Sequence, residues 1–339
     1  MKRIDIICFS DAGAALAEKL QAYLSRAQVS IHSTPHTARQ YAFEAHENMK
    51  EAMGEMFAHS DAVIFICAVG IAVRTIAPFI QSKTTDPAVV VMDDQGRFAI
   101  SLLSGHIGGA NTLAKELAAA IGAQAVITTA TDGAGKFSCD AWAAEHDCAV
   151  SSMALAKKVS AEILKQDIPV ATEFPLPETL PGGLSAGDSG TSGIYIGVHT
   201  EEPFIETLRL IPRILTLGIG CRRGATKEQI VSAVETVLQA NQIDARAIAQ
   251  ICSIDVKKDE VGLLEAAKHL NVPIHFYSAA ELLAVPGNFE ESAFVYEQVG
   301  VGNVCERAAV ISGETPVIPK TAADGVTIAA AIKKWSIVF

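Results

Sequence analysis

The sequence predicts an α/β protein with two mainly parallel-sheet α/β domains joined by a variable Pro/Gly-rich middle segment. Short β-branched runs alternate with longer segments that carry apolar residues at helical spacing. At 339 residues, the chain exceeds the size at which one hydrophobic core usually keeps growing. Hydrophobic residues make up 50% and charged residues 19%, a balance typical of sizeable folded cores.

The first domain is predicted to span residues 1–134. Buried strands are indicated by short apolar runs, and helices by apolar residues three and four positions apart. The expected strands are residues 4–9, 62–67, 88–92 and 125–128, and the expected helices are residues 14–24 and 111–121. Because strands separated by helices usually pair in parallel, helices should cover both faces of this sheet.

The middle segment, residues 135–212, differs from the first domain in its amino-acid composition. From about Cys148 to Pro212 prolines and glycines crowd among serines. These residues interrupt helices and strands more often than they extend them. A domain boundary is therefore expected near residue 212.

In the third segment, residues 213–339, strand-like and helix-like runs alternate again. Thr226 and Gln229 form a capping-box pair, and Ser278 with Glu281 repeats that signature. The expected elements are strands 214–219, 247–251, 273–276 and 325–328, a helix opening at 226, a helix near 261–270, and a short helix that is entered through 300–306 and closes before Gly313.

Composition excludes several classes of function. A formal net charge of −11 argues against a nucleic-acid partner, which needs clustered Lys and Arg. No run reaches the roughly 18 to 20 apolar residues of a membrane-spanning helix. Residues 1–8 are typical of a strand and not of a secretory signal peptide, so we expect a cytoplasmic protein. Seven scattered cysteines without C-x-x-C spacing suggest neither disulfides nor a zinc site.

The segment 104–111, Ser-Gly-His-Ile-Gly-Gly-Ala-Asn, is the most informative in the chain. Its three glycines can bring bare backbone against a ligand, and His106 can act as a general base or acid near neutral pH. Asp132 follows a predicted strand and is a candidate partner for His106. Two simpler explanations stay open: His106 packs at a helix start, and Asp132 caps the next helix.

Arginines mark candidate anion sites. Arg222 and Arg223 lie beside glycines at a predicted helix N-terminus, a combination that suits carboxylates. The spacing Gly218-x-Gly220-x-x-x-Gly224 does not match the dinucleotide fingerprint, so NAD or FAD binding is not favoured. The alternative is a solvated arginine pair beside a turn.

Other polar residues have both a binding and a structural explanation. Ser253 and Asp255 follow a predicted strand and can hydrogen-bond a ligand, and Lys320 can supply a cation. Arg74 follows another strand, where α/β proteins often bind ligands, and Lys83 extends the same rim. Glu306 lies three residues after Asn303, so reciprocal helix capping explains it without chemistry.

A set of motifs together resembles the CbiG family of cobalt-precorrin-5A hydrolases. The motifs are residues 70–74 (GIAVR), 83–87 (KTTDP), 89–93 (VVVMD), 104–111 (SGHIGGAN), 218–224 (GIGCRRG), 253–255 (SID) and 302–306 (GNVCE). The resemblance extends from about residue 50 to 333, and each motif alone would be weak. The C-terminal part also resembles a stand-alone protein of the aerobic cobalamin route.

This resemblance implies hydrolysis of cobalt-precorrin-5A to cobalt-precorrin-5B, with opening of a δ-lactone and release of acetaldehyde. The cobalt comes with the corrinoid substrate, so no separate cofactor or metal site is expected, and other enzymes of the pathway are candidate partners. The roles we assign are His106 as base, Asp132 as its orienting partner, Gly108 and Gly109 as oxyanion donors, and Arg74, Lys83, Ser104, Asn111, Arg222, Arg223, Ser253, Asp255, Glu306 and Lys320 as substrate contacts.

Two other functions stay open from the residues alone. A non-catalytic carrier of tetrapyrrole intermediates would need only the arginines and apolar walls, and would release no acetaldehyde. A nucleotide-binding α/β enzyme such as a methyltransferase would bind its cofactor tightly, and the mis-spaced glycines argue against it.

Overall fold

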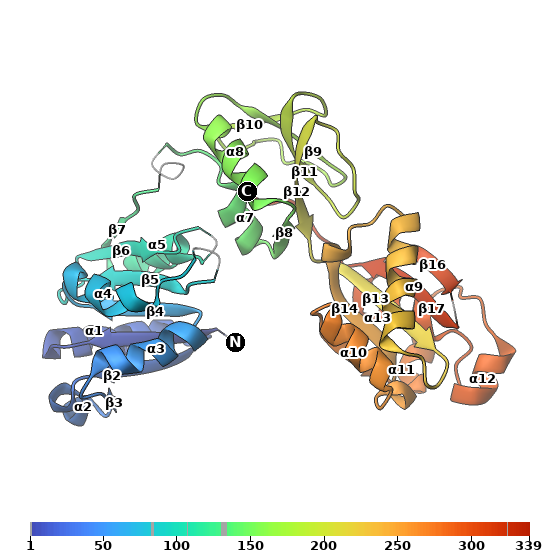
Figure 1. The fold of residues 1–339 in the computed structure, drawn as a ribbon, viewed down its shortest axis with the longest axis horizontal. Coiled ribbons are helices and arrows are strands. Elements are labelled where there is room, and N and C mark those ends of the chain that lie inside the picture. The colour runs from blue at the N-terminus through green and yellow to red at the C-terminus, as the bar shows by residue number, and fades with distance from the viewer. Residues whose placement is uncertain (1, 83–84, 107, 130–133, 324) are drawn as a thin grey trace. The chain divides into compact units, whose positions relative to one another are not determined.

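The computed structural model describes residues 2–82, 85–106, 108–129, 134–323 and 325–339. Its strands form three sheets, one of seven strands and two of five (Figure 1). The chain divides into two compact units, one formed by Met1–Glu145 with Ile163–Lys165 and the other by His146–Glu162 with Gln166–Phe339. Among the described residues, none of the helices combines the length and the apolar character needed to cross a bilayer.

The first unit is built on the seven-stranded sheet, in the order β3-β2-β1-β4-β5-β6-β7. Its strands are β1 (Arg3–Cys8), β2 (Gln28–Ser33), β3 (Glu44–Ala45), β4 (Ala62–Ile66), β5 (Ala88–Met92), β6 (Phe98–Leu103) and β7 (Gln124–Val126). Its helices are α1 (Asp11–Tyr23), α2 (Pro35–Tyr41), α3 (Met49–His59), α4 (Val69–Ile76), α5 (Ala110–Ile121) and α7 (Cys139–Glu145), with a 3₁₀ turn at Ala77–Phe79.

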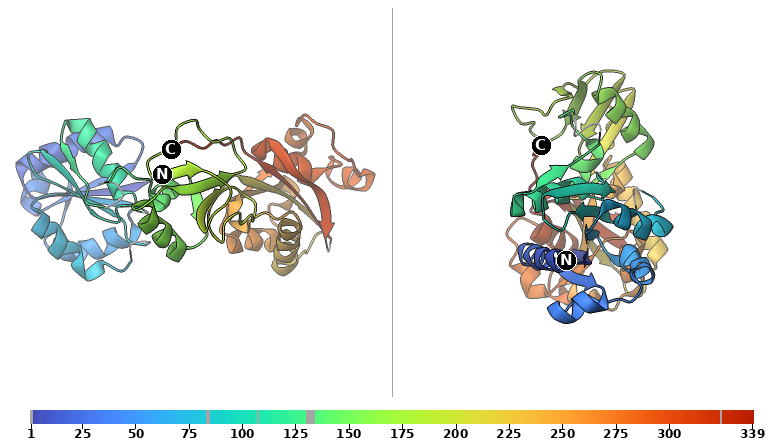
Figure 2. Two further views of the ribbon diagram at one scale, coloured as in Figure 1. Left: turned by 90° about the horizontal axis from the view of Figure 1, so that it is seen from above. Right: turned by 90° about the vertical axis from the view of Figure 1, so that its left-hand side faces the viewer.

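Helices cover both faces of this sheet (Figure 2). β4 and β5 are buried along their whole length, which explains their uninterrupted apolar sequence. Neighbouring residues alternate between the two faces: Ile64 packs in the core shared with α1 and α5, and Phe65 in the core shared with α3. The predicted α/β class with a mainly parallel sheet is confirmed.

Three strands of the first unit, β2, β3 and β6, were not predicted, and β6 runs antiparallel to its neighbour. β6 pairs antiparallel with β5 after a short turn at residues 93–97. In that turn the Asp93 carboxylate accepts hydrogen bonds from the backbone N–H groups of Arg97 and Phe98. The chain therefore reverses by a hairpin within the sheet that was predicted to be mainly parallel.

The middle segment contains a folded sheet. Its strands, in the order β10-β9-β11-β12-β8, are β8 (Cys148–Val150), β9 (Ile168–Thr172), β10 (Leu184–Ala186), β11 (Ser192–Ile196) and β12 (Glu206–Pro212), and α8 (Met153–Ile163) follows β8. The proline- and glycine-rich stretch supplies loops between these strands, while Ile194 and Leu208 are fully buried. The segment is thus more than a linker. The domain boundaries drawn from the sequence stay a prediction.

The third sheet has the order β15-β14-β13-β17-β16. Its strands are β13 (Leu215–Cys221), β14 (Ile248–Ile254), β15 (Ile274–Tyr277), β16 (Thr315–Ala323) and β17 (Val326–Ile332). The helices are α9 (Lys227–Ala240), α10 (Val261–His269), α11 (Ala279–Leu283), α12 (Ala293–Val299) and α13 (Val304–Gly313), with 3₁₀ turns at Ala245–Ala247 and Asp255–Lys257. Both predicted capping boxes, at α9 and at α11, are confirmed.

Close packing of α13 on β13 explains the glycine spacing that does not fit a dinucleotide site. A Cβ atom added at Gly218 would lie 1.8 Å from the Cys305 carbonyl oxygen and 2.7 Å from the Ala309 backbone nitrogen. Real Cβ atoms do not approach backbone so closely, so only glycine fits here. This glycine serves helix–sheet packing.

Candidate active site

The hairpin formed by β5 and β6 determines the position of the loop that carries His106. The loop follows β6, and the end of β6 lies beside the start of β5, where Leu103 pairs with Val89. β7 runs parallel to β6, so the residues after β7 reach the same edge of the sheet. α4 instead begins after the carboxyl end of β4, which lies at the opposite end of the strands. The candidate site is therefore framed by the described loop residues 104–106, 108 and 109 and by residues 127–129 after β7.

The backbone of the loop requires two of its glycines. A Cβ atom at Gly108 would lie 2.4 Å from the Ser104 Cβ and 2.8 Å from the Ser104 carbonyl oxygen. Gly109 has a φ of 83° in the left-handed region and precedes α5. Its N–H donates to the His106 carbonyl oxygen at 2.9 Å, so this amide, expected as an oxyanion donor, is engaged within the loop.

Asn111 holds the loop to its surroundings. Its side chain is 5% exposed; the Asn111 Oδ1 accepts from the Ser101 hydroxyl at 2.6 Å, and its Nδ2 donates to the Thr129 hydroxyl at 3.1 Å. These contacts tie α5 to β6 and to the segment after β7. Asn111, expected as a substrate contact, thus has a structural role here.

Ser104 offers a different feature. Its side chain is buried, and its hydroxyl has no hydrogen-bond partner in the described part of the chain. A buried hydroxyl without a partner costs about 1–3 kcal/mol. Such a group gains most from a ligand or a water molecule that reaches it, which keeps Ser104 among the candidate substrate contacts.

His106 is paired with a carboxylate. Its Nδ1 lies 3.2 Å from the Asp140 Oδ1 and 3.2 Å from the Ser138 hydroxyl. Ser138 in turn donates to Asp140 at 2.9 Å. The side chains of His106 and Asp140 are 19% and 13% exposed, so the pair is half-buried at the surface of the first unit. A carboxylate at Nδ1 orients the imidazole and stabilises its protonated form.

Asp140 keeps its negative charge over the whole neutral range. Burial raises the pKa of its carboxyl, but hydrogen bonds from His106 and Ser138 and the charge of His106 outweigh burial and lower the pKa to about 2. The ionised carboxylate favours a positive charge on the ring whenever His106 takes up a proton. The arrangement therefore suits a histidine that acts first as a base and then as an acid.

Asp132, which the sequence indicated as the partner of His106, lies outside the described residues. Ser138 and Asp140 were missed, because nothing in the spacing of residues 106 and 140 links them. Ser138, two residues before Asp140 at a helix start, is typical of an ordinary helix cap. Only the return of the chain from β7 into α7 brings Asp140 to the loop.

The lowered pKa of Asp140 predicts an acid-sensitive contribution to stability. Because the folded-state pKa lies below the ordinary 3.8, the ionised carboxylate stabilises the fold above about pH 4, and this stabilisation is lost as the pH falls toward about 2. We expect the wild type to lose up to about 2 kcal/mol more than Asp140→Asn between about pH 5 and pH 2. Urea denaturation at several pH values measures the difference; equal losses in both proteins would contradict the assigned ion pair.

The cations predicted for the first unit are only partly described. Arg74 is exposed near the end of α4, and its guanidinium lies over Gly70, where an added Cβ atom would be 3.2 Å from Nη1. Val69, Ile71 and Val73 of the same helix are 37%, 38% and 43% exposed. This helix therefore presents an apolar surface with one cation. Lys83 lies outside the described residues.

In the second unit, the loop after β13 lines a cavity of about 500 Å³ together with the start of α10. Arg222 and Arg223 are exposed. The amides of this loop are engaged: the Gly224 N–H donates to Glu260 at 2.7 Å, and the capping box satisfies the start of α9. Several of the amides expected beside the guanidiniums, those of Gly224, Thr226 and Gln229, are therefore already used within the fold.

Three other residues predicted to contact the substrate differ in how exposed their side chains are. Ser253 is fully buried and donates to the Ile219 carbonyl oxygen at 2.7 Å, which ties β14 to β13 and leaves no surface for a ligand. Glu306 pairs with Asn303 and accepts from the Lys320 N–H at 2.9 Å, so the capping explanation fits it. Asp255 is exposed at the end of β14.

Fold and site together define a two-unit α/β protein with a carboxylate-paired histidine on a glycine loop and exposed arginines in each unit. Family models described as "Cobalamin synthesis G N-terminal" and "Cobalamin synthesis G C-terminus" match residues 51–132 and 215–331. The chain is 32% identical over 341 residues to the cobalt-precorrin-5A hydrolase of Salmonella typhimurium (strain LT2), covering 96% of each chain. The chain belongs to the CbiG family.

Two further proteins are similar to this chain. The cobalt-precorrin-5A hydrolase of Priestia megaterium is 32% identical over 307 residues, which cover 84% of this chain and 82% of that protein. Protein CobE of Sinorhizobium sp. is 32% identical over 98 residues, which cover 29% of this chain and 64% of that protein.

Proposed function

We propose that this protein hydrolyses cobalt-precorrin-5A in cobalamin biosynthesis. The observation that carries the proposal is the 32% identity to a curated hydrolase of that name over 96% of both chains. The histidine–carboxylate pair beside the glycine loop supplies chemistry that such a reaction needs. In this proposal the cobalt ion is part of the substrate.

The first step is attack of water on the carbonyl of the substrate's δ-lactone. His106 would take a proton from the water as the new C–O bond forms, and Asp140 would stabilise the resulting imidazolium. The lactone C–O bond then breaks, and the proton passes from His106 to the departing alkoxide oxygen. One water is consumed, and a carboxylic acid and a hydroxyl group are formed.

The second step releases a two-carbon fragment as acetaldehyde. Loss of the hydroxyl proton lets its oxygen form the aldehyde C=O as the adjacent C–C bond breaks, and the electron pair of that bond passes to the macrocycle, which takes up a proton. The same histidine suits this step, because it alternates between base and acid. The product is cobalt-precorrin-5B.

Arginines are proposed to bind the carboxylates at the rim of the substrate. The protein and its substrate are both negatively charged, so long-range attraction is weak and short charge-assisted hydrogen bonds must supply affinity. We expect Arg222→Ala with Arg223→Ala to raise KM about tenfold or more with little change in kcat, since each lost bond to a charged group is worth about 1.5–3 kcal/mol. Steady-state kinetics measures this, and an unchanged KM would remove these residues from the substrate site.

Incubation of the purified protein with cobalt-precorrin-5A tests the proposed function. Acetaldehyde is followed by its reduction with a coupled alcohol dehydrogenase, and the corrinoid product by mass spectrometry. We expect acetaldehyde to appear in proportion to the corrinoid consumed. Tight binding of the corrinoid without acetaldehyde would identify a carrier and refute the hydrolase.

A further inference from the structure

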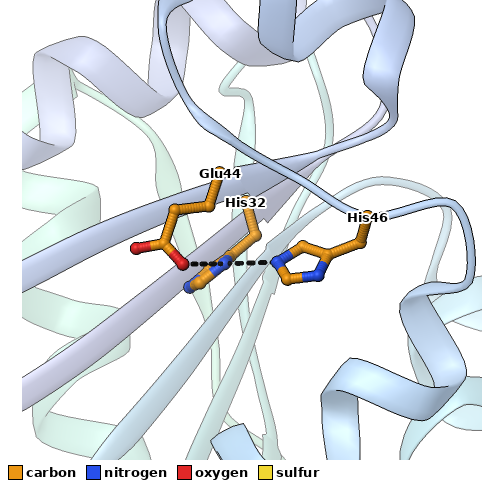
Figure 3. Close-up of side chains that lie close together, drawn as sticks. All are labelled: His32, Glu44 and His46. Atoms are coloured by element: carbon orange, nitrogen blue, oxygen red, sulfur yellow. Dashed lines mark hydrogen bonds and ion pairs between the residues drawn. The ribbon is translucent and has the colours of Figure 1, made fainter.

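A second cluster of titratable side chains lies in the first unit, at the outer edge of its sheet. His32 on β2, Glu44 on β3 and His46 just after β3 converge, and their nearest nitrogen and oxygen atoms all lie within 4.8 Å of one another (Figure 3). The His32 Nδ1 is 3.0 Å from the His46 Nε2 and 3.5 Å from the Glu44 Oε2. None of these residues belongs to the site described above.

The backbone fixes this cluster. His32 and Glu44 are directly opposite each other in the parallel pairing of β2 and β3. The His46 N–H donates to the Ser33 carbonyl oxygen at 3.0 Å, which sets the position of the third residue. The three side chains are therefore held by strand pairing and not by a loose loop, which lowers the cost of binding an ion between them.

The far side of His32 is also occupied. Its Nε2 lies 3.0 Å from the Asp5 Oδ1, and both side chains are buried. A carboxylate accepts and cannot donate, so the Nε2 carries a proton, and in neutral His32 the Nδ1 presents its lone pair. The His46 Nε2 at 3.0 Å and the Glu44 Oε2 at 3.5 Å both lie at that lone pair. A proton on the His46 Nε2 can be donated to it, and a metal ion can take the place of that proton and use all three atoms as ligands. A carboxylate behind a histidine, with the lone pair directed away from it, is the usual support of a metal-binding histidine.

The spacing fits a small transition-metal ion. Two ligand atoms at about 2.0–2.1 Å from a tetrahedral Zn²⁺ lie about 3.3 Å apart. The distances from the His32 Nδ1 to the His46 Nε2, 3.0 Å, and to the Glu44 Oε2, 3.5 Å, are close to this value. Two imidazole nitrogens and one carboxylate oxygen form a common zinc ligand set that leaves a further position for water. The Glu44 side chain is 61% exposed, which gives an ion access from solvent.

We propose that His32, Glu44 and His46 bind a divalent transition-metal ion of the Zn²⁺ type, supported by Asp5. This site is separate from the proposed hydrolase chemistry and needs no corrinoid. Its expected effect is to fasten the short edge strand β3 to β2. The competing explanation is a hydrogen bond from the His46 Nε2–H to the His32 Nδ1, with no metal affinity.

Zn²⁺ binding to the full-length protein, freed of metal with a chelator, tests the proposal. We expect one equivalent to bind by calorimetry and to raise the thermal midpoint, and Co²⁺ to give visible absorption typical of a low-coordinate nitrogen-ligated ion. His46→Ala should weaken binding at least about 10–100-fold, the range seen when even supporting residues are lost. His269→Ala, an exposed histidine of the second unit, is the matched control and should bind like the wild type.

Two results would overturn the site: equal Zn²⁺ affinity in the wild type and His46→Ala, or failure of the folded wild type to bind Zn²⁺. Glu44→Gln guards against misfolding, because Glu44 is exposed and its replacement keeps the side-chain size. This variant should keep the metal-free thermal midpoint of the wild type and lose affinity. Because these measurements use no corrinoid, their failure would leave the proposed hydrolysis unaffected.

Discussion

Replacing His106 with alanine is expected to slow acetaldehyde release by about 10²–10⁴-fold, the usual contribution of a positioned general acid–base. The loss should fall on kcat and leave the KM for the corrinoid nearly unchanged, because other residues, Arg222 and Arg223, are proposed to bind the substrate's carboxylates. Single-turnover measurements of acetaldehyde with the purified variant give the size of the effect. His106 is partly exposed, so its loss should not unfold the first unit.

Two companion variants separate chemistry from structure. His59→Ala removes an exposed histidine at the end of α3 in the same unit and should keep the wild-type rate. Asp140→Asn keeps the size of the side chain but removes the charge, so we expect a smaller loss of kcat than in His106→Ala and a changed pH profile. Parent-level acetaldehyde release by His106→Ala would exclude this residue from the mechanism.

Gly218→Ala is expected to destabilise the second unit by more than about 3 kcal/mol, at the upper end of the cost of overpacking. The added Cβ would lie 1.8 Å from the Cys305 carbonyl oxygen, so β13 or α13 would have to move. Backbone atoms cannot rotate out of the way as a flexible side chain can. Urea denaturation of the full-length protein should show this loss, or the variant should fail to accumulate as folded protein.

Gly220→Ala is the matched control, because it lies two residues further along the same strand. Its Cβ would meet only the Thr327 hydroxyl, at 2.6 Å, and that group can rotate. We expect a cost within about 1 kcal/mol. Equal denaturation midpoints for Gly218→Ala and the wild type would show that α13 does not pack on β13 as described.

Much of the fold could be predicted because local signals were strong. β4 and β5 are buried over their whole length, and their apolar runs mark them as strands. The capping boxes fixed the starts of α9 and α11 through local hydrogen bonds. β6 was missed because Phe98–Leu103 follows a short turn without an Asn-Gly or Asp-Gly pair, the strongest local signal of a hairpin.

The site was only half predictable for a related reason. His106 and its glycines form one continuous segment, and the structure shows why Gly108 must be glycine. Asp140 reaches the loop through tertiary packing, which no spacing in the sequence reports. Ser253 and Asn111 looked like ligand contacts because they are polar residues near strand ends, but their side chains are used in hydrogen bonds within the fold.

His106 is proposed to direct water onto the substrate's lactone. Turnover of cobalt-precorrin-5A in water enriched in heavy oxygen tests it most directly, with mass spectrometry of the corrinoid product. We predict that the wild type places one heavy oxygen in the newly formed carboxylate while acetaldehyde is released, and that His106→Ala does so at a small fraction of that rate. Substrate recovered unlabelled from the wild type, with no acetaldehyde, would contradict the account.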